Sequence, residues 1–179
     1  MLKEWGNIEE KRKTKEFGSY PWSFTKMSQE VARGIFGLVE KFSPQQIVIE
    51  NTVAGRNRDS QRQLEFIHYA LLDLINKSLA ESRPEVYYVS PGIWRNKLQI
   101  KLTAEDKQDN KILRRGTKEQ KRLLKDKKNL RGIISKKHLA IRYVHNKYNI
   151  NLKVKQDDVA DAICLGDAFL LNCKVDQGE

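Results

Sequence analysis

Apolar residues recur along the chain at spacings that predict helices separated by two short strands. Phe24, Met27, Val31 and Ile35 stand three or four positions apart, so they share one face of a helix over residues 24–42. Similar spacing, or a Ser-Pro pair that starts a helix, predicts further helices over residues 60–82, 91–98, 135–148 and 158–172. Runs rich in β-branched and aromatic residues predict strands at Gln46–Glu50 and Glu85–Val89.

This order of elements predicts a single α/β domain over residues 1–179, with neighbouring parallel strands. The strand Gln46–Glu50 carries apolar residues on both faces, which is typical of a central strand in a sheet that helices cover. Residues 1–22 are polar and irregular, and we expect one or two short strands there, around Gly6 and Phe17.

Positive charge is concentrated in one segment of the chain. The sequence contains 34 Lys and Arg against 23 Asp and Glu, a formal net charge of +11. Residues 101–137 alone hold 14 of those basic residues and 5 of the acidic ones. An anionic partner is therefore expected, nucleic acid above all. Large apolar residues are few in this segment, so we interpret it as a basic insertion, either a loop or a polar helix, that contacts DNA as a flap.

Composition argues against several other classes of protein. No apolar run approaches the roughly 18 residues of a membrane span, and the polar residues that follow Met1 contain no signal-peptide core. Cys164 and Cys173 lie in one apolar stretch, and we interpret them as reduced cysteines of a cytosolic protein rather than as a disulfide or a metal-binding pair.

Acidic residues at two places in the chain are the candidates for catalysis. Glu50 ends the most apolar predicted strand, and ligands of such sheets bind at the carboxyl ends of strands. Asp158 and Asp161 stand three positions apart, which places them about 5–6 Å apart on one helix face. Their neighbours are apolar, so the two carboxylates are costly there unless a cation or hydrogen bonds compensate them. The helix dipole alone explains Asp157 and Asp158 well, and Asp161 less well.

These acids and the excess of basic residues together indicate one kind of chemistry. Carboxylate oxygens are the ligands that Mg²⁺ and Mn²⁺ prefer. Two such ions, about 3.5–4 Å apart, activate water and stabilise the leaving oxygen when a phosphodiester is cleaved. A carboxylate cluster in a basic protein therefore predicts a metal-dependent nuclease.

Five segments of the chain resemble a RuvC-type Holliday-junction resolvase, most closely in pattern the phage-encoded members. They read IVIE followed by Asn, GRNRDSQRQLEFIHYALL, VYYVSPGIWRNKL, KKHLAIRYVHNKYNI and DDVADAICLG, and the resemblance as a whole covers about residues 30–172. The resemblance implies a ribonuclease H-like fold, with a central mixed sheet flanked by helices. It also implies a homodimer in the cytoplasm of a bacterium or phage-infected cell, and Phe66, Ile67, Tyr69 and Ala70 on the helix after Glu50 are the residues expected to face the partner. The implied activity is metal-dependent, structure-selective cleavage of branched DNA in recombination and repair, with two Mg²⁺ or Mn²⁺ ions.

The resemblance also implies roles for particular residues. By position, Glu50 matches the family's acid on the fourth strand, and Asp158 and Asp161 match its two acids on the final helix. Asp157 is an additional acid, which either supports the metal ligands or caps the helix. The other residues are basic and are expected to contact DNA, in most cases its phosphates near the metals: Arg56, Arg58, Arg62, Arg95, Lys136, Lys137 and His138. His138 is also a candidate general acid or base.

One departure from the family is serious. The family carries a metal-binding Asp on its first strand, whereas the first Asp of this chain is Asp59. We therefore expect the N-terminal strand to be missing, metals to bind weakly, and residues 1–179 to show little or no cleavage. An upstream strand ending in Asp is expected to restore activity. Two alternatives stay open: a non-catalytic nucleic-acid-binding protein of the same fold, and another ribonuclease H-like nuclease.

Overall fold

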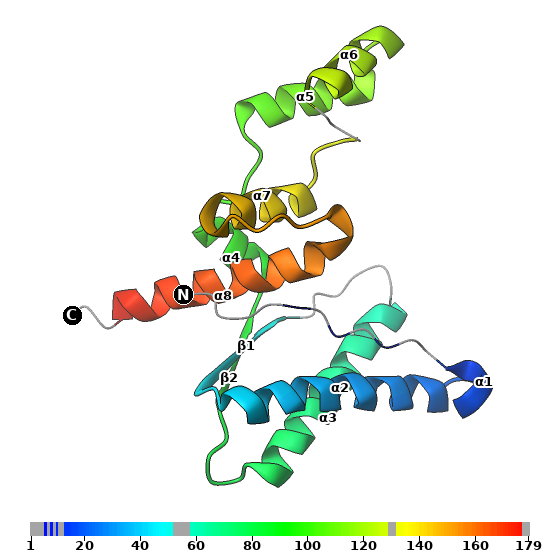
Figure 1. Cartoon of the computed structure of the whole chain (residues 1–179), viewed down its shortest axis with the longest axis vertical. Coiled ribbons are helices and arrows are strands. Elements are labelled where there is room, and N and C mark those ends of the chain that lie inside the picture. The colour runs from blue at the N-terminus through cyan, green and yellow to red at the C-terminus, as the bar shows by residue number, and fades with distance from the viewer. Residues whose placement is uncertain are drawn as a thin grey trace. The chain divides into compact units, whose positions relative to one another are not determined.

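The computed structural model describes residues 6, 8, 10, 13–51, 58–128 and 132–176, with side chains described as far as residue 171 (Figure 1). Contacts divide the chain into two compact units, Met1–Ser90 and Pro91–Glu179, and each is described by itself. The described residues are mainly helical and include a small parallel sheet, so the prediction of a mixed α/β fold is confirmed at that level. No helix in these residues combines the length and apolar composition needed to span a membrane.

The first unit contains two long helices and the two strands. Its elements are α1 (Thr14–Phe17), α2 (Trp22–Phe42), β1 (Gln46–Glu50), α3 (Arg58–Ser78) and β2 (Glu85–Val89). Both strands lie where the sequence predicts them. Helix α2 begins two residues before its predicted start, and α3 begins two residues before and ends four residues before its predicted bounds of 60–82. The predicted strand around Phe17 is wrong, because Thr14–Phe17 forms a helical turn in which the amide of Phe17 donates to the carbonyl of Lys13 at 3.0 Å. Gly6 lies in no element, among neighbours outside the described residues.

The helices of the first unit pack through one apolar cluster. Ala32 and Phe36 of α2 meet Leu71 and Ile75 of α3, and all four are buried. Ile47 of β1 packs against the same cluster. Of the predicted apolar face of α2, Phe24 and Met27 are buried, whereas Val31 and Ile35 are half-buried. An amphipathic helix gains stability mainly by burying its apolar face, and here Ala32 and Phe36 complete that face.

The sheet differs from the predicted one. β1 and β2 pair in parallel, with Gln46 opposite Glu85 and Glu50 opposite Val89. In the described part of the chain the sheet has these two strands alone, so β1 is half-buried and not the covered central strand that was predicted. The central mixed sheet of a ribonuclease H-like fold stays a prediction.

The second unit is helical throughout its described residues. Its elements are α4 (Pro91–Lys97), α5 (Ala104–Arg115), α6 (Lys118–Lys128), α7 (Lys136–Tyr148), a 3₁₀ turn η1 (Val154–Gln156) and α8 (Asp157–Asp176). Trp94, Val144 and Cys164 are fully buried where α4 and α7 pack on α8. Ala140 and Ala160 are also fully buried, and such small side chains let α7 and α8 approach closely. Cys164 is a buried free thiol, as predicted, whereas the side chain of Cys173 lies outside the described residues.

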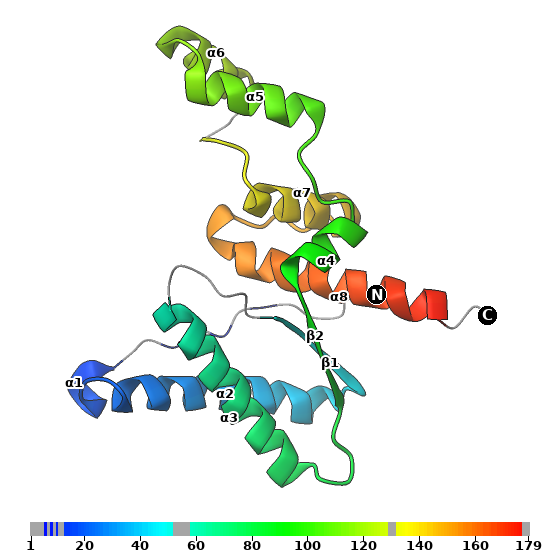
Figure 2. The same cartoon turned by 180° about the vertical axis from the view of Figure 1, so that it is seen from behind.

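The basic insertion forms a helical hairpin, which both views show as α5 and α6 side by side (Figure 2). We call Thr103–Lys128 the basic arm. Of the two predicted alternatives, a loop or a polar helix, the helical one describes the arm. Capping explains where its helices begin: the Thr103 hydroxyl accepts from the amide of Asp106, and the Thr117 hydroxyl accepts from the amide of Gln120.

Candidate metal centre on the final helix

The candidate carboxylates lie in the first turns of α8. The amide of Lys153 donates to Oε1 of Gln156 at 3.0 Å, which fixes the 3₁₀ turn that leads into the helix. Asp157 has helical backbone angles and is the first residue of α8, so the helix begins one residue earlier than predicted and Asp157 is not its cap. Acidic side chains are stabilised at this position because the helix dipole is positive there.

The three aspartates in the first turns of α8 differ in exposure. Asp157 is buried at 8% exposure, Asp158 is exposed, and Asp161 is half-buried. Asp157 and Asp161 stand four positions apart, so they share a face of the helix, and Asp158 lies three positions from Asp161. The sequence assigned Asp157 a supporting role, yet it is the most deeply buried of the three.

Lys137 lies beside these carboxylates. Its ammonium group, near the start of α7, forms an ion pair with Oδ2 of Asp157. This hydrogen bond raises the pKa of Lys137, and the charges of Asp157, Asp158 and Asp161 add to the effect. The lysine therefore stays protonated at neutral pH and offsets part of the repulsion among the three acids.

Arg95 is the second cation of this group. Its Nη2 atom donates to Oδ2 of Asp161 at 2.7 Å, and both side chains are mostly shielded from solvent. The guanidinium also lies over the ring of Trp94, 4.4 Å from its centroid. Trp94 is fully buried, and its ring holds the arginine in place against Asp161.

The donor chemistry of this group suits a hard divalent cation, but the ligand set is small. Mg²⁺ keeps several waters and is commonly held by only one or two carboxylates together with substrate phosphates. Asp158 and Asp161 meet that requirement. Among the described residues, however, no group of three His, Cys, Asp or Glu side chains is arranged to hold a metal ion. Lys137 and Arg95 bind carboxylate oxygens of Asp157 and Asp161, and a metal ion with more protein ligands would need those oxygens.

The remaining predicted residues are distributed over both units. Glu50 ends β1 in the first unit and is half-buried. Arg58 and Arg62 lie exposed in the first turns of α3, while Arg56 lies outside the described residues. Glu50 thus belongs to the first unit, whereas Asp157, Asp158 and Asp161 belong to the second.

Two further predicted residues begin α7. Lys136 is exposed at the first helical position. His138 accepts a hydrogen bond on Nδ1 from the amide of Ser135 at 3.2 Å, so the imidazole takes part in a capping box. The proposed acid–base role of His138 stays a prediction beside this structural role.

A buried polar anchor of the basic arm escaped the sequence analysis. Arg142 of α7 donates two hydrogen bonds to Asp106, each 3.0 Å long. Asn110 donates to the carbonyl of Ile134 and accepts from its amide. The sequence gives little basis for predicting these contacts. Thr103 and Asp106 have capping-box spacing, but no neighbouring residue indicates that Asp106 also contacts α7.

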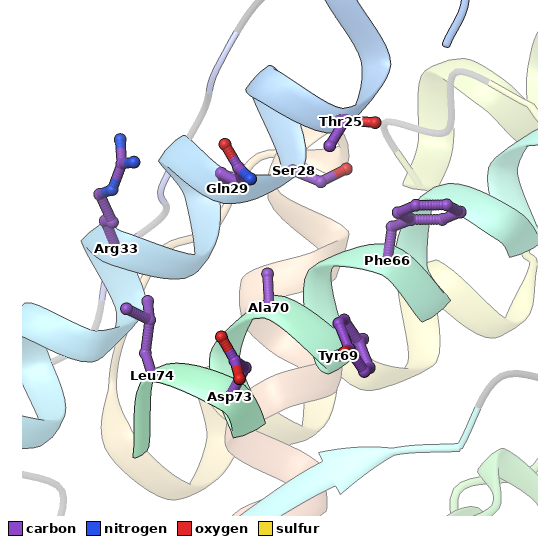
Figure 3. A pocket seen from close by; sticks show the side chains of 9 residues that line it. All are labelled: Thr25, Ser28, Gln29, Arg33, Phe66, Tyr69, Ala70, Asp73 and Leu74. Atoms are coloured by element: carbon purple, nitrogen blue, oxygen red, sulfur yellow. The ribbon is translucent and has the colours of Figure 1, made fainter. Parts of the chain in front are cut away.

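The surface that was expected to face a second copy lies between α2 and α3. A groove there, of about 220 Å³, is lined on the α3 side by Phe66, Tyr69 and Ala70, with Ser28 and Arg33 among the residues of α2 (Figure 3). Phe66 and Tyr69 are exposed, as a partner surface requires. Ile67, named with them in the sequence, is buried and unavailable to a partner.

Comparisons of the chain with protein-family models, with curated proteins and with solved structures find no match.

Proposed function

We propose that the chain belongs to a lineage of metal-dependent endonucleases that cleave branched DNA, of the RuvC resolvase type. The observation that carries the proposal is the group of three aspartates in the first turns of α8, with Lys137 and Arg95 beside them. Carboxylates that would hold a divalent cation thus lie next to basic groups that would hold a phosphate.

Each side chain has a separate part in this proposal. Asp158, which is exposed, and Asp161 would hold Mg²⁺ or Mn²⁺, which when bound supplies the charge stabilisation for phosphodiester hydrolysis. Lys137 and Arg95 would exchange a carboxylate for a phosphate oxygen, because a guanidinium or ammonium group binds either anion. Glu50 is assigned to the reaction on the sequence resemblance alone. The sequence also lacks the family's first Asp, so the expected activity is low.

Metal binding is the direct test. Addition of Mn²⁺ should broaden the backbone amide NMR signals of the first turns of α8 by paramagnetic relaxation. In Asp158→Asn and in Asp161→Asn, the Mn²⁺ concentration needed for the same broadening should rise by about 10- to 100-fold. Asp73→Asn is the matched control, because Asp73 is a surface acid of α3 whose partner is Lys77. Unchanged broadening in the two α8 variants would overturn the metal assignment.

Cleavage of a four-way junction is the second readout. Slow Mn²⁺-dependent cleavage that disappears in Asp158→Asn, Asp161→Asn and Glu50→Gln, but not in Asp73→Asn, would support the nuclease. A junction bound no better than duplex DNA would count against the resolvase type.

A second candidate is a non-catalytic nucleic-acid-binding protein. It is favoured by one observation: Asp157 and Asp161 are already paired with Lys137 and Arg95, as in a purely structural ion-pair group. Tight DNA binding with neither Mn²⁺ broadening nor cleavage would select this candidate.

A further inference from the structure

The two sides of α5 carry opposite kinds of polar side chain. Asp106, Asp109 and Asn110 are buried. The four basic residues of the helix are all exposed: Lys107, Lys111, Arg114 and Arg115. Positions 107, 111 and 114 follow helical spacing, so these exposed cations form a stripe along one side of the helix.

The buried acids of the arm are compensated from within the second unit. Asp106 receives both hydrogen bonds from Arg142. Asp109 receives the ammonium of Lys128 at 2.5 Å, and Glu105 receives the same ammonium at 2.6 Å. All three acids of α5 are thus paired with Lys128 of α6 or Arg142 of α7, and not with the exposed cations of the stripe.

The second helix of the arm adds to this surface. None of the residues of α6 is buried. Lys118, Arg122 and Lys125 are exposed at positions i, i+4 and i+7, so they also lie along one face. Two exposed acids, Glu119 and Asp126, stand on the neighbouring face of α6, and they interrupt the positive surface only there.

We infer that the basic arm binds the phosphate backbone of nucleic acid through the exposed cations of α5. The inference rests on the proposed function for its choice of partner, but not on cleavage. Charge complementarity favours a polyanion. An anionic membrane is disfavoured, since helices that lie on membranes carry Trp, Phe or Leu beside their cations, whereas the α5 stripe contains none of these. The bidentate Arg142–Asp106 pair would hold the stripe in a fixed orientation on the second unit.

Fluorescence anisotropy with duplex DNA in EDTA tests the inference. A variant with K107Q, K111Q, R114Q and R115Q is compared with a matched control, K13Q, K15Q, K41Q and R83Q, which removes four exposed cations of the first unit. The arm variant should lose at least about tenfold in affinity, and its slope of log K against log salt should shrink by about 3 to 4, while the control changes little. Circular dichroism confirms that both variants are folded.

Three results would overturn the inference: wild-type affinity in the arm variant, equal losses in both variants, or binding of the arm to phosphatidylserine vesicles in preference to DNA. Since EDTA removes the metal, this experiment is independent of the nuclease. An arm that binds DNA in a protein that never cleaves it would defeat the proposed enzyme and leave the inference standing.

Discussion

At the scale of single residues, the second unit depends on buried carboxylates that each face a cation. Asp106 is the best determined of them, with a bidentate arginine and a capping amide around it. The hydrogen bonds from Arg142 and the contacts with Thr103 lower the pKa of Asp106, against the opposing effect of burial. A carboxylate held this way stabilises the fold while it is ionised.

Asp106→Asn should therefore lower the free energy of unfolding by about 1–2 kcal/mol at pH 7, because Arg142 loses its charged partner. The pKa of Asp106 is lower in the folded state, so its contribution is fully present above the ordinary value of 3.8 and is lost as pH falls through the folded value. Urea titrations at pH 7 and at about pH 2.5 should show the variant and wild type converging at low pH. Asp126→Asn, at an exposed position of α6, should differ little from wild type at either pH.

Cys164 gives a second prediction at this scale. Burial raises its pKa to about 12, with smaller contributions from Asp161 and Asp167. The thiol is therefore protonated at pH 8 and should react with iodoacetamide only after unfolding, because the thiolate is the nucleophile. Mass spectrometry of the peptide containing Cys164, with and without urea, measures this; rapid labelling of the native protein would contradict the burial.

At the scale of elements, the turn between α5 and α6 is tightly packed. Its residue Gly116 donates its amide to the carbonyl of Ile112 at 2.8 Å. A Cβ atom added at Gly116 would lie 2.6 Å from that carbonyl oxygen, so the backbone would have to move. The hairpin therefore requires glycine because there is no space for a side chain at this position. The backbone conformation is not the reason, because any residue can adopt the φ of −67° found at Gly116.

Gly116→Ala should destabilise the arm by about 1–3 kcal/mol, the usual cost of overpacking. Gly37→Ala is the control, because Gly37 is exposed inside α2 with no atom within 4 Å of the added Cβ. That change should stabilise α2 by up to about 1 kcal/mol through helix propensity. Amide hydrogen exchange, resolved by segment, separates the two effects; equal protection of α5 and α6 in Gly116→Ala and wild type would contradict the packing argument.

At the scale of the whole molecule, charge and metal affinity bear on stability. The net charge of +11 means that anions are attracted and divalent cations are not, so a metal must be held by specific carboxylates. Any ligand that binds only the folded state raises its stability by mass action.

Mn²⁺ at about tenfold excess over its dissociation constant should therefore raise the free energy of unfolding by about 1.4 kcal/mol. The Asp158→Asn, Asp161→Asn double variant should lose this gain, because both proposed ligands are changed. Differential scanning calorimetry over a range of Mn²⁺ concentrations measures it, with Ca²⁺ and Na⁺ at matched ionic strength as controls. A metal-dependent gain of the same size in the double variant would place the ion elsewhere.

Local patterns in the sequence determined most of the elements. The helical spacing of Phe24, Met27 and Val31 and the β-branched run of Gln46–Glu50 placed α2 and β1 within two residues of their observed bounds. Such patterns suffice because helix and strand are set largely by side-chain period over short distances. Cys164 was likewise predicted correctly as a buried reduced cysteine, from its apolar surroundings.

Only the tertiary structure decided which polar groups meet. Asp106 with Arg142, Asp157 with Lys137 and Asp161 with Arg95 are each far apart in sequence, and no local period encodes such pairs. The half-exposure of β1 was missed for the same reason, since burial of a strand depends on how many neighbours the sheet supplies. The sequence thus determined that this chain is basic, mixed α/β and rich in acids on its last helix. The tertiary structure decided that Asp157 and Asp161 are ion-paired and that the basic insertion is a helical arm, because both depend on contacts between distant segments.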